Sequence, residues 1–222
     1  MFDANCLKLM FVAGSQDFYH VKGGKNDRIN ALLDALESAL KSKITAFQFR
    51  QKGDLALQDP VEIKQLALEC QKLCQKYGVP FIVNDEAPLA LELKADGVHV
   101  GQEDMAIEEV ITLCKKRQFI GLSVNTLEQA LKARHLDGVS YLGVGPIFPT
   151  PSKKDIKQVV GVELLKKIRD SGVKKPLIAI GGINTDNASK LRECGISGIA
   201  VISAIAQAKD KALAVGKLLN NA

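Results

Sequence analysis

Several residues suited to anion binding lie at the end of one short apolar run, Ala46–Arg50. Successive side chains of an extended strand point to opposite sides, so Gln48, Arg50 and Lys52 are expected to share one side. One amide and two cations in a row form a donor cluster that suits a phosphate or a pyrophosphate. The alternative is a basic strand end that flanks a turn.

Carboxylates follow the next two apolar runs. Asp85 comes directly after Asn84, and Asp104 closes the segment Gly101–Asp104. Carboxylates at the ends of adjacent barrel strands can meet on one hard cation. Mg2+ typically takes one or two carboxylates together with waters and phosphate oxygens. Alternatively, the two acids only cap the helices that follow them. The phosphate-binding strand end beside them favours a metal site.

A glycine- and proline-rich segment follows a later apolar run. Gly143 and Gly145 look like the start of a dinucleotide fingerprint, but the third glycine is missing and prolines stand where the helix should open. A nucleotide interpretation therefore fails. A stiff loop that presents Thr150, Ser152 and Lys153 fits an anion-binding flap better, and a structural crossover loop is the alternative.

The last two apolar runs lead into small residues. Gly181 and Gly182 follow one run, and Ser203 directly follows the other. Glycine lets a phosphate approach bare backbone N–H groups, and a serine hydroxyl adds a donor. Loops after the last two strands form the common phosphate site of (β/α)8 barrels, so these residues predict a second anion site. A tight packing turn is the alternative.

Two further polar residues belong to apolar runs themselves. Ser123 ends the run Phe119–Ser123, and His99 lies between Val98 and Val100. A histidine in such a run is more often a packed core residue than a base, so we expect His99 to be part of the core. The sequence contains no His-Glu-x-x-His, Gly-x-Ser-x-Gly or Walker motif and offers no obvious general base.

The elements that must position these residues alternate along the chain. Eight short apolar runs predict strands: Leu7–Val12, Ala46–Arg50, Phe81–Asn84, Gly97–Val100, Phe119–Ser123, Tyr141–Val144, Leu177–Ile180 and Gly198–Ile202. Amphipathic segments predict helices, clearest in Arg28–Leu40, Pro60–Tyr77, Ile107–Lys116, Leu127–Leu136, Val162–Asp170, Thr185–Cys194 and Lys209–Leu219. This alternation predicts one (β/α)8 TIM barrel over residues 1–222, with the site at the C-terminal ends of the strands. A doubly wound sheet is the alternative.

The composition is that of an ordinary globular protein, with 46% hydrophobic and 25% charged residues. No apolar run approaches the roughly 20 residues that cross a bilayer, and the N-terminus lacks the basic region of a signal peptide. Five cysteines without a Cys-x-x-Cys motif indicate reduced thiols. The sequence therefore predicts a cytoplasmic protein without a membrane partner.

The charge balance and the aromatic content limit the partners. The 30 basic and 25 acidic residues give a net charge of +5, which suits small anionic substrates, although a lysine-rich surface alone would explain it. With 5% aromatic residues and no Trp, the chain has no stacking platform for single-stranded nucleic acid, so no nucleic-acid partner is expected. The sequence is compatible with a homo-oligomer and does not determine the oligomeric state.

Taken together, the motifs resemble the thiamine-phosphate synthase family. The matching segments run in that family's order over roughly residues 46–205: Gln48–Lys52, Val83–Asp85, Ala95–Asp104, Gly121–Ser123, Gly143–Thr150, Ile180–Ile183 and Val201–Ile205. The resemblance implies a (β/α)8 barrel transferase. It would join 4-amino-2-methyl-5-hydroxymethylpyrimidine diphosphate to a thiazole phosphate, giving thiamine phosphate and pyrophosphate.

The resemblance also implies a role for each matching residue. The pyrimidine diphosphate would be held by Gln48, Arg50, Lys52, Asn84 and Lys153. Mg2+, the implied cofactor, would be bound by Asp85 and Asp104, and Ser123 would lie at the pyrimidine. The thiazole phosphate would be held by Thr150, Ser152, Gly182, Ile202 and Ser203. The catalytic residues among these would be Arg50, Ser123 and Lys153.

The implied chemistry agrees with the missing base. If pyrophosphate leaves first, the amino-substituted pyrimidine delocalises the methylene cation, and the thiazole nitrogen attacks without losing a proton. Catalysis then consists of stabilising the leaving group and holding the partners in line. Positive charges from Arg50, Lys52, Lys153 and Mg2+ suit that task.

Three positions depart from the family's usual pattern. Glu86 and Pro88 stand where the family usually has Arg and an acid, and Ser152 stands where Thr is common. We expect Glu86 to stabilise the start of a helix rather than to bind the metal. A related thiazole tautomerase of the same fold needs neither metal nor diphosphate, so the intact acids and Lys153 argue against it. A non-catalytic thiazole-phosphate binding protein is the third interpretation.

Overall fold

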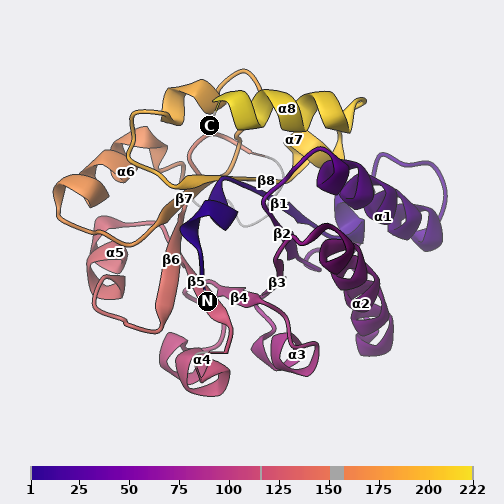
Figure 1. The fold of residues 1–222 in the computed structure, drawn as a ribbon, viewed down its shortest axis with the longest axis horizontal. Helices are drawn as coiled ribbons and strands as arrows, with labels where there is room; N and C mark the ends of the chain where they lie inside the picture. Colours follow the sequence, from indigo (N-terminus) through magenta and orange to yellow (C-terminus); the bar gives the residue numbers. More distant parts are fainter. Residues whose placement is uncertain (1, 116, 151–157, 222) are drawn as a thin grey trace.

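The computed structural model describes residues 2–115, 117–150 and 158–221 of the chain. Its parallel strands form a closed barrel, in which each strand pairs with its neighbours in sequence and the last pairs with the first (Figure 1). The strands are β1 (Leu9–Ala13), β2 (Ala46–Phe49), β3 (Phe81–Asn84), β4 (Gly97–Val100), β5 (Phe119–Val124), β6 (Val139–Val144), β7 (Leu177–Ile180) and β8 (Gly198–Val201). The predicted (β/α)8 barrel is confirmed, and closure excludes a doubly wound sheet.

Helices surround the barrel on its outer side (Figure 1). The α-helices are α1 (Lys25–Lys41), α2 (Pro60–Tyr77), α3 (Ala87–Glu92), α4 (Ile107–Cys114), α5 (Leu127–Ala133), α6 (Gly161–Asp170), α7 (Ser203–Ala206) and α8 (Lys211–Asn221). Short 3-10 helices are η1 (Ala4–Leu7), η2 (Ser15–Phe18) and η3 (Ala188–Leu191).

Helix α2 illustrates how local sequence sets the bounds of an element. The Asp59 side chain accepts a hydrogen bond from the Val61 N–H at 2.8 Å, and Pro60 begins the helix. Gly78 ends it in the left-handed conformation, with φ at 66°. Between this start and this end, α2 has one buried face. That face includes Leu66 and packs against the barrel core.

The region between β7 and β8 differs from the prediction. The expected helix Thr185–Cys194 is wrong for most of its length, because only the short η3 is helical. Asn184 Oδ1 accepts a hydrogen bond from the Asp186 N–H, and Asn187 Oδ1 accepts one from the Asn184 N–H, both at 2.9 Å. Such side-chain bonds offer the backbone an alternative to a helix. Helix α3 was not among the clear predictions, because six residues are too few to show a helical period.

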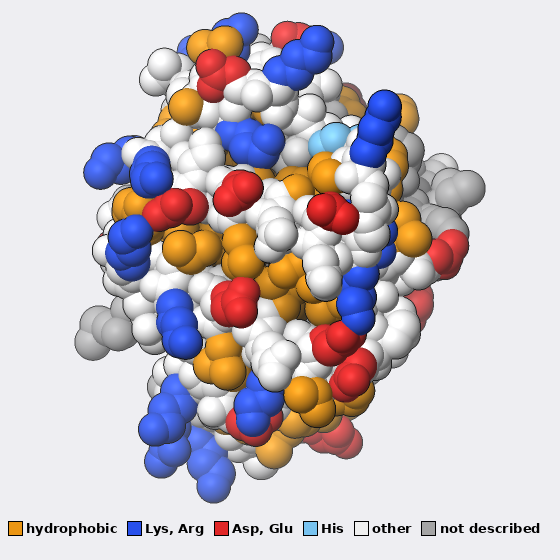
Figure 2. Space-filling view, turned by 90° about the vertical axis from the view of Figure 1, so that its right-hand side faces the viewer, with side chains coloured by type: hydrophobic (Ala, Val, Ile, Leu, Met, Phe, Trp, Pro, Cys, Tyr) orange, Lys and Arg blue, Asp and Glu red, His pale blue; other side chains and the backbone are white. Residues whose placement is uncertain are grey.

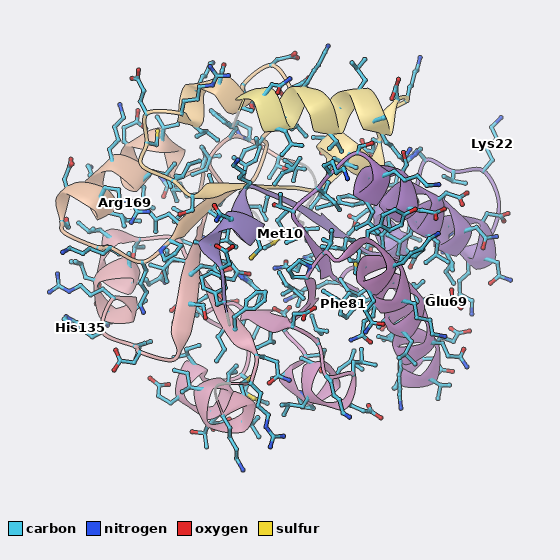
Figure 3. All side chains as sticks on the ribbon, in the orientation of Figure 1. Met10, Lys22, Glu69, Phe81, His135 and Arg169 are labelled. Atoms are coloured by element: carbon cyan, nitrogen blue, oxygen red, sulfur yellow. The ribbon has the colours of Figure 1, made fainter. Side chains whose placement is uncertain are left out.

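Alternation along the strands separates an outer core from the barrel interior. Val98 and Val100 of β4 belong to the large cluster under the helices, whereas Met10 and Val12 of β1 belong to the inner cluster. Figure 3 shows Met10 near the centre of the barrel. The interior is therefore packed with side chains and is not a pore.

The segment before β1 closes the barrel at the N-terminal ends of the strands. The Phe2 ring lies 5.2 Å from the Phe119 ring and 6.3 Å from the Tyr141 ring, measured between centroids. These aromatic contacts cover the bottom of the inner cluster. The main cavity lies at the opposite end, where the strands lead into their following loops.

Helices α1 and α2 carry part of the surface charge. Figure 2 shows this side of the molecule, where basic and acidic side chains are interspersed with small apolar areas. Lys76 Nζ lies 2.8 Å from Glu37 Oε1, and Lys25 pairs with Glu62, so both ion pairs join the two helices. Part of the lysine content therefore serves the helical surface. Among the described residues, none of the helices has the length and apolar character that crossing a bilayer requires.

Candidate active site

A cavity of about 360 Å³ opens at the C-terminal ends of the strands. Loops and strand ends from β2 to β7 contribute to its walls. Seven residues to which the family resemblance gives a role line it: Arg50, Lys52, Asn84, Asp85, Asp104, Ser123 and Thr150. The parallel barrel thus brings together polar residues that are far apart in sequence. This agrees with the expectation that the site of a (β/α)8 barrel lies at the C-terminal ends of its strands.

The charged centre of this cavity consists of one lysine and two carboxylates. Lys52 Nζ lies 2.9 Å from Asp85 Oδ2 and 3.5 Å from Asp104 Oδ1. Burial disfavours the charged ammonium, but the two carboxylates outweigh it and raise the pKa of Lys52. The two acids are thus held around a single positive charge.

The two carboxylates differ in acidity. Burial raises the pKa of Asp85, and the neighbouring Asp104 raises it further, although Lys52 opposes both effects. Burial also acts against ionised Asp104, but hydrogen bonds from Asp85 and from the Gly101 N–H, together with Lys52, lower its pKa overall. The pair behaves as two like charges of which Asp104 ionises first.

The backbone at the end of β3 turns both Asn84 and Asp85 toward the cavity. Asp85 adopts the left-handed conformation, with φ at 65°, which is uncommon outside glycine but tolerated by Asp and Asn. Its N–H donates to the His99 carbonyl oxygen at 2.7 Å, which fixes this conformation against β4. Glu86, the next residue, is exposed and does not line the cavity.

The two carboxylates meet the requirements of a Mg2+ ion shared with a substrate. Within the described ranges, no three His, Cys, Asp or Glu side chains gather into a site that could hold a metal by themselves. Mg2+ needs only one or two carboxylates when waters and phosphate oxygens supply the other ligands. The Gly101 N–H holds Asp104 Oδ2 at 2.8 Å and so orients this carboxylate beside Asp85. The donor set therefore fits Mg2+.

A smaller pocket adjoins the main cavity where β7 and β8 end. Its lining includes the predicted thiazole-phosphate residues Thr150, Gly182, Ile202 and Ser203. Gly182 is left-handed, with φ at 66°, and a Cβ there would lie 2.5 Å from the Pro149 carbonyl oxygen. Gly182 thus also allows the loop after β6 to pass close by. The predicted flap residues Ser152 and Lys153 lie outside the described residues.

Comparison with known proteins decides which family this site belongs to. The family model described as thiamine monophosphate synthase matches residues 18–205 of the chain. The chain belongs to this family. The thiamine-phosphate synthase of Helicobacter pylori strain ATCC 700392 / 26695 is 89% identical over the whole length of both chains. That of Pasteurella multocida is 52% identical over 97% of this chain and 96% of its own.

Solved structures agree with this membership of the thiamine monophosphate synthase family. The thiamine phosphate pyrophosphorylase from Pyrococcus furiosus superposes with a TM-score of 0.81 and 35% identity, covering 98% of this chain and 96% of its own. A 3-hexulose-6-phosphate synthase superposes with a TM-score of 0.64 at 14% identity, which shows the fold alone. The family resemblance predicted from the motifs is thereby confirmed.

Two polar residues, Gln48 and His99, lie deeper in the barrel than the main cavity. Gln48 is buried inside the barrel, where its amide Nε2 lies 3.7 Å from Met10 Sδ. His99 is also buried, as predicted for a core residue, but its Nε2 lies 2.9 Å from Ser123 Oγ. A polar layer thus supports the floor of the cavity.

Sequence reasoning missed two further residues that line the cavity. Asn125 follows β5 and donates to the Gly145 carbonyl oxygen, which ties the loop after β5 to that after β6. Gln102 Nε2 donates to the Ser123 carbonyl oxygen at 2.6 Å. Both are polar residues that closely follow a strand. Asp85 was selected from the sequence by this same position, so the criterion could have identified Gln102 and Asn125 as well.

Proposed function

We propose that the protein is a thiamine-phosphate synthase. In this reaction 4-amino-2-methyl-5-hydroxymethylpyrimidine diphosphate and 4-methyl-5-(2-phosphoethyl)thiazole give thiamine phosphate and pyrophosphate; the carboxylated form of the thiazole would release carbon dioxide as well. The single observation that carries the proposal is the cluster of Lys52, Asp85 and Asp104 in a cavity that adjoins a second, glycine-lined pocket. Two adjacent anion sites suit an enzyme that joins two phosphorylated molecules.

The larger cavity would receive the pyrimidine diphosphate. Asp85 and Asp104 would hold Mg2+ there, and the bound ion would neutralise charge on the diphosphate. Lys52 lies between the two carboxylates and can transfer its contact to a phosphate oxygen, while Arg50 lines the same wall. These cations favour departure of pyrophosphate, since they stabilise the charge that develops on it.

The smaller pocket would receive the phosphate of the thiazole. Asn187 Nδ2 donates to the Gly182 carbonyl oxygen at 2.9 Å and so orients this peptide group. In a trans peptide the following N–H, that of Ile183, points the opposite way. Ile183 and Ser203 both line the pocket, so a backbone donor and a hydroxyl are available to a phosphate.

The bonding changes account for the lack of a base. The bond between the pyrimidine methylene carbon and the diphosphate oxygen breaks, and its electron pair leaves with pyrophosphate. The thiazole nitrogen then donates its lone pair to the methylene carbon, and no proton is lost. We assign Ser123 to the pyrimidine ring and Lys153 to the diphosphate, in line with the family motifs. The site's task is to align the partners and exclude water.

Two other interpretations of the function do not explain the cluster of Lys52, Asp85 and Asp104. A thiazole tautomerase handles neither a diphosphate nor a metal, and a non-catalytic thiazole-phosphate binder needs only the smaller pocket. Neither explains why Lys52 and two carboxylates lie together in the main cavity. The relatives named above all carry synthase or pyrophosphorylase names.

We further propose that the enzyme works in the cytoplasm on small molecules alone. All five cysteines are free thiols: Cys6, Cys70, Cys74, Cys114 and Cys194. Burial raises the pKa of the Cys70 thiol well above its ordinary value, so this thiol stays protonated. Unreactive buried thiols are typical of proteins kept in a reducing compartment.

Release of pyrophosphate tests the proposed function. The purified protein is mixed with both substrates, with Mg2+ or with excess chelator, and pyrophosphate and thiamine phosphate are quantified. We expect equal amounts of the two products with Mg2+ and none with chelator, because two carboxylates would otherwise repel the diphosphate. Full activity in chelator, or conversion of the thiazole alone, would contradict the proposal.

A further inference from the structure

A chain of polar side chains crosses the barrel interior beneath the main cavity. Ser123 Oγ lies 2.9 Å from His99 Nε2, and His99 Nδ1 lies 2.9 Å from the Tyr141 hydroxyl. Gln48, which is also buried inside the barrel, interacts with that hydroxyl and acts to lower its pKa. The four residues come from β2, β4, β5 and β6. This row of side chains therefore depends on the packing of these strands in the barrel.

Two glycines provide the space that the His99 and Tyr141 rings of this hydrogen-bonded row occupy. A Cβ on Gly121 would lie 2.2 Å from Tyr141 Cζ and 2.3 Å from His99 Nδ1. A Cβ on Gly143 would lie 2.9 Å from His99 Cε1. Any side chain at either glycine would therefore displace the imidazole or the phenol. Glycines on β5 and β6 thus leave room for the His99 and Tyr141 rings.

The direction of the hydrogen bonds follows from the donors available. Burial raises the pKa of the fully buried Tyr141 hydroxyl far above its ordinary value, so the hydroxyl keeps its proton. His99 Nδ1 lies 2.9 Å from this hydroxyl, and the single hydroxyl proton is therefore assigned to the bond with Nδ1. A neutral imidazole that accepts at Nδ1 carries its own proton on Nε2, and this proton is donated to Ser123 Oγ.

We propose that His99 and Tyr141 are positioning residues that fix the Ser123 hydroxyl as a hydrogen-bond donor toward the pyrimidine. This inference rests on the proposed function. The hydroxyl oxygen accepts from His99, so its proton is available to an acceptor in the cavity, which Ser123 lines. A ring nitrogen of an aminopyrimidine is such an acceptor. Tyr141 does not line the main cavity but a small pocket beneath it, and its hydroxyl is linked to Ser123 through His99.

The histidine tautomer can be measured without substrate. The chain has three histidines, so 15N-histidine labelling gives few signals to assign. We expect His99 to show a protonated Nε2 and an unprotonated Nδ1. Tyr141→Phe removes only the buried hydroxyl and should shift the Nδ1 signal. Tyr77→Phe is the matched control: it removes a hydroxyl that lies 3.1 Å from Glu37 Oε1 on the outer helices, and it should leave His99 unchanged.

Kinetics test whether the tautomer matters for the reaction. Tyr141→Phe should lower kcat roughly 3- to 10-fold, the value of about one hydrogen bond, and change KM for the diphosphate less than about 2-fold. The KM should hold because Arg50 and Lys52, which would bind the diphosphate, are untouched. In a Ser123→Ala background, the same substitution should change kcat less than about 2-fold, because Tyr141 then has no hydroxyl to orient.

A second variant keeps the test decisive if Tyr141→Phe does not fold. His99→Leu removes the hydrogen bonds to Tyr141 and Ser123 at similar volume, and His99→Gln retains an amide donor. We expect the Gln variant to recover part of the kcat lost in the Leu variant. A protonated Nδ1 in the wild type, or an equal Tyr141→Phe effect with and without Ser123, would overturn the proposal. A wild type that releases no pyrophosphate would instead refute the proposed function, and the tautomer measurement would still stand.

Discussion

Replacing Asp17 with Asn is expected to stabilise the protein above pH 6. Asp17 lies in η2, in the loop after β1, and only 8% of its surface is exposed. Its Oδ2 accepts hydrogen bonds from the Gly14 N–H and from Gln16 Nε2, both at 2.8 Å. Gln16 Nε2 also donates to the Arg50 carbonyl oxygen, so this loop holds the backbone of a residue that lines the main cavity.

The magnitude follows from the acidity of the buried carboxyl. Burial raises the pKa of Asp17 from 3.8 to about 6, although its hydrogen bonds and Arg50 oppose the change. The folded state therefore binds this proton more tightly than the unfolded state does. Its stabilising contribution is complete below pH 3.8 and is lost as the pH rises through about 6. At about 1.4 kcal/mol per tenfold change in acidity, the loss amounts to about 3 kcal/mol.

Urea unfolding of wild type and Asp17→Asn at several pH values measures this effect. The amide keeps an oxygen acceptor for Gly14 but carries no charge. The variant should gain about 1 kcal/mol over the wild type at pH 4.5 and about 3 kcal/mol at pH 7.5. Asp27→Asn is the matched control, because Asp27 makes the same contact to the Gly24 N–H at an exposed position. A gain that does not grow with pH, or one that Asp27→Asn reproduces, would refute the reasoning.

Three further substitutions test the site itself. Asp104→Asn can still accept from the Gly101 N–H, so stability in urea should hold, while kcat should fall at least ~100-fold and half-maximal rate should need more Mg2+. Glu86→Ala should keep kcat within about tenfold, because Glu86 is exposed and outside the cavity; a hundredfold loss would place it near the metal. Gly182→Ala should lower the unfolding free energy, since its Cβ would meet the Pro149 carbonyl oxygen, and should raise KM for the thiazole phosphate more than for the diphosphate; an equal rise for both substrates would contradict this expectation.

The barrel could be predicted because its strands and helices differ in the length of their apolar segments and in the spacing of their apolar residues. Runs such as Leu177–Ile180 are short, continuous and apolar, which suits strands buried on both faces, whereas α2 shows a clear helical period. Once the strands are parallel, their C-terminal ends must meet at one face. The convergence of Lys52, Asp85 and Asp104 therefore follows from topology, although their distances do not.

Other features depend on contacts that a single segment does not reveal. Strict alternation after β3 would turn Asp85 away from Asn84, yet both line the cavity because Asp85 is left-handed. That conformation is held by a bond to the His99 carbonyl oxygen on β4. Likewise, His99 looks like any apolar-strand histidine until Tyr141, 42 positions later, is placed beside it. Such roles become visible only once the neighbouring strands are in register.

The two glycines at the end of β6, Gly143 within the strand and Gly145 directly after it, show why residue type alone does not determine function. In sequence, Gly143 and Gly145 resemble the first half of a phosphate-binding fingerprint, which would use glycine to expose backbone N–H groups. In the barrel, Gly143 leaves space for the His99 ring, and a Cβ on Gly145 would lie 2.1 Å from the Ile180 carbonyl oxygen on β7. The same residue type thus serves side-chain packing at one position and strand approach at the next. Which of these applies is decided by the adjacent strand, so the meaning of a glycine in this family site has to be derived from its neighbours across the sheet.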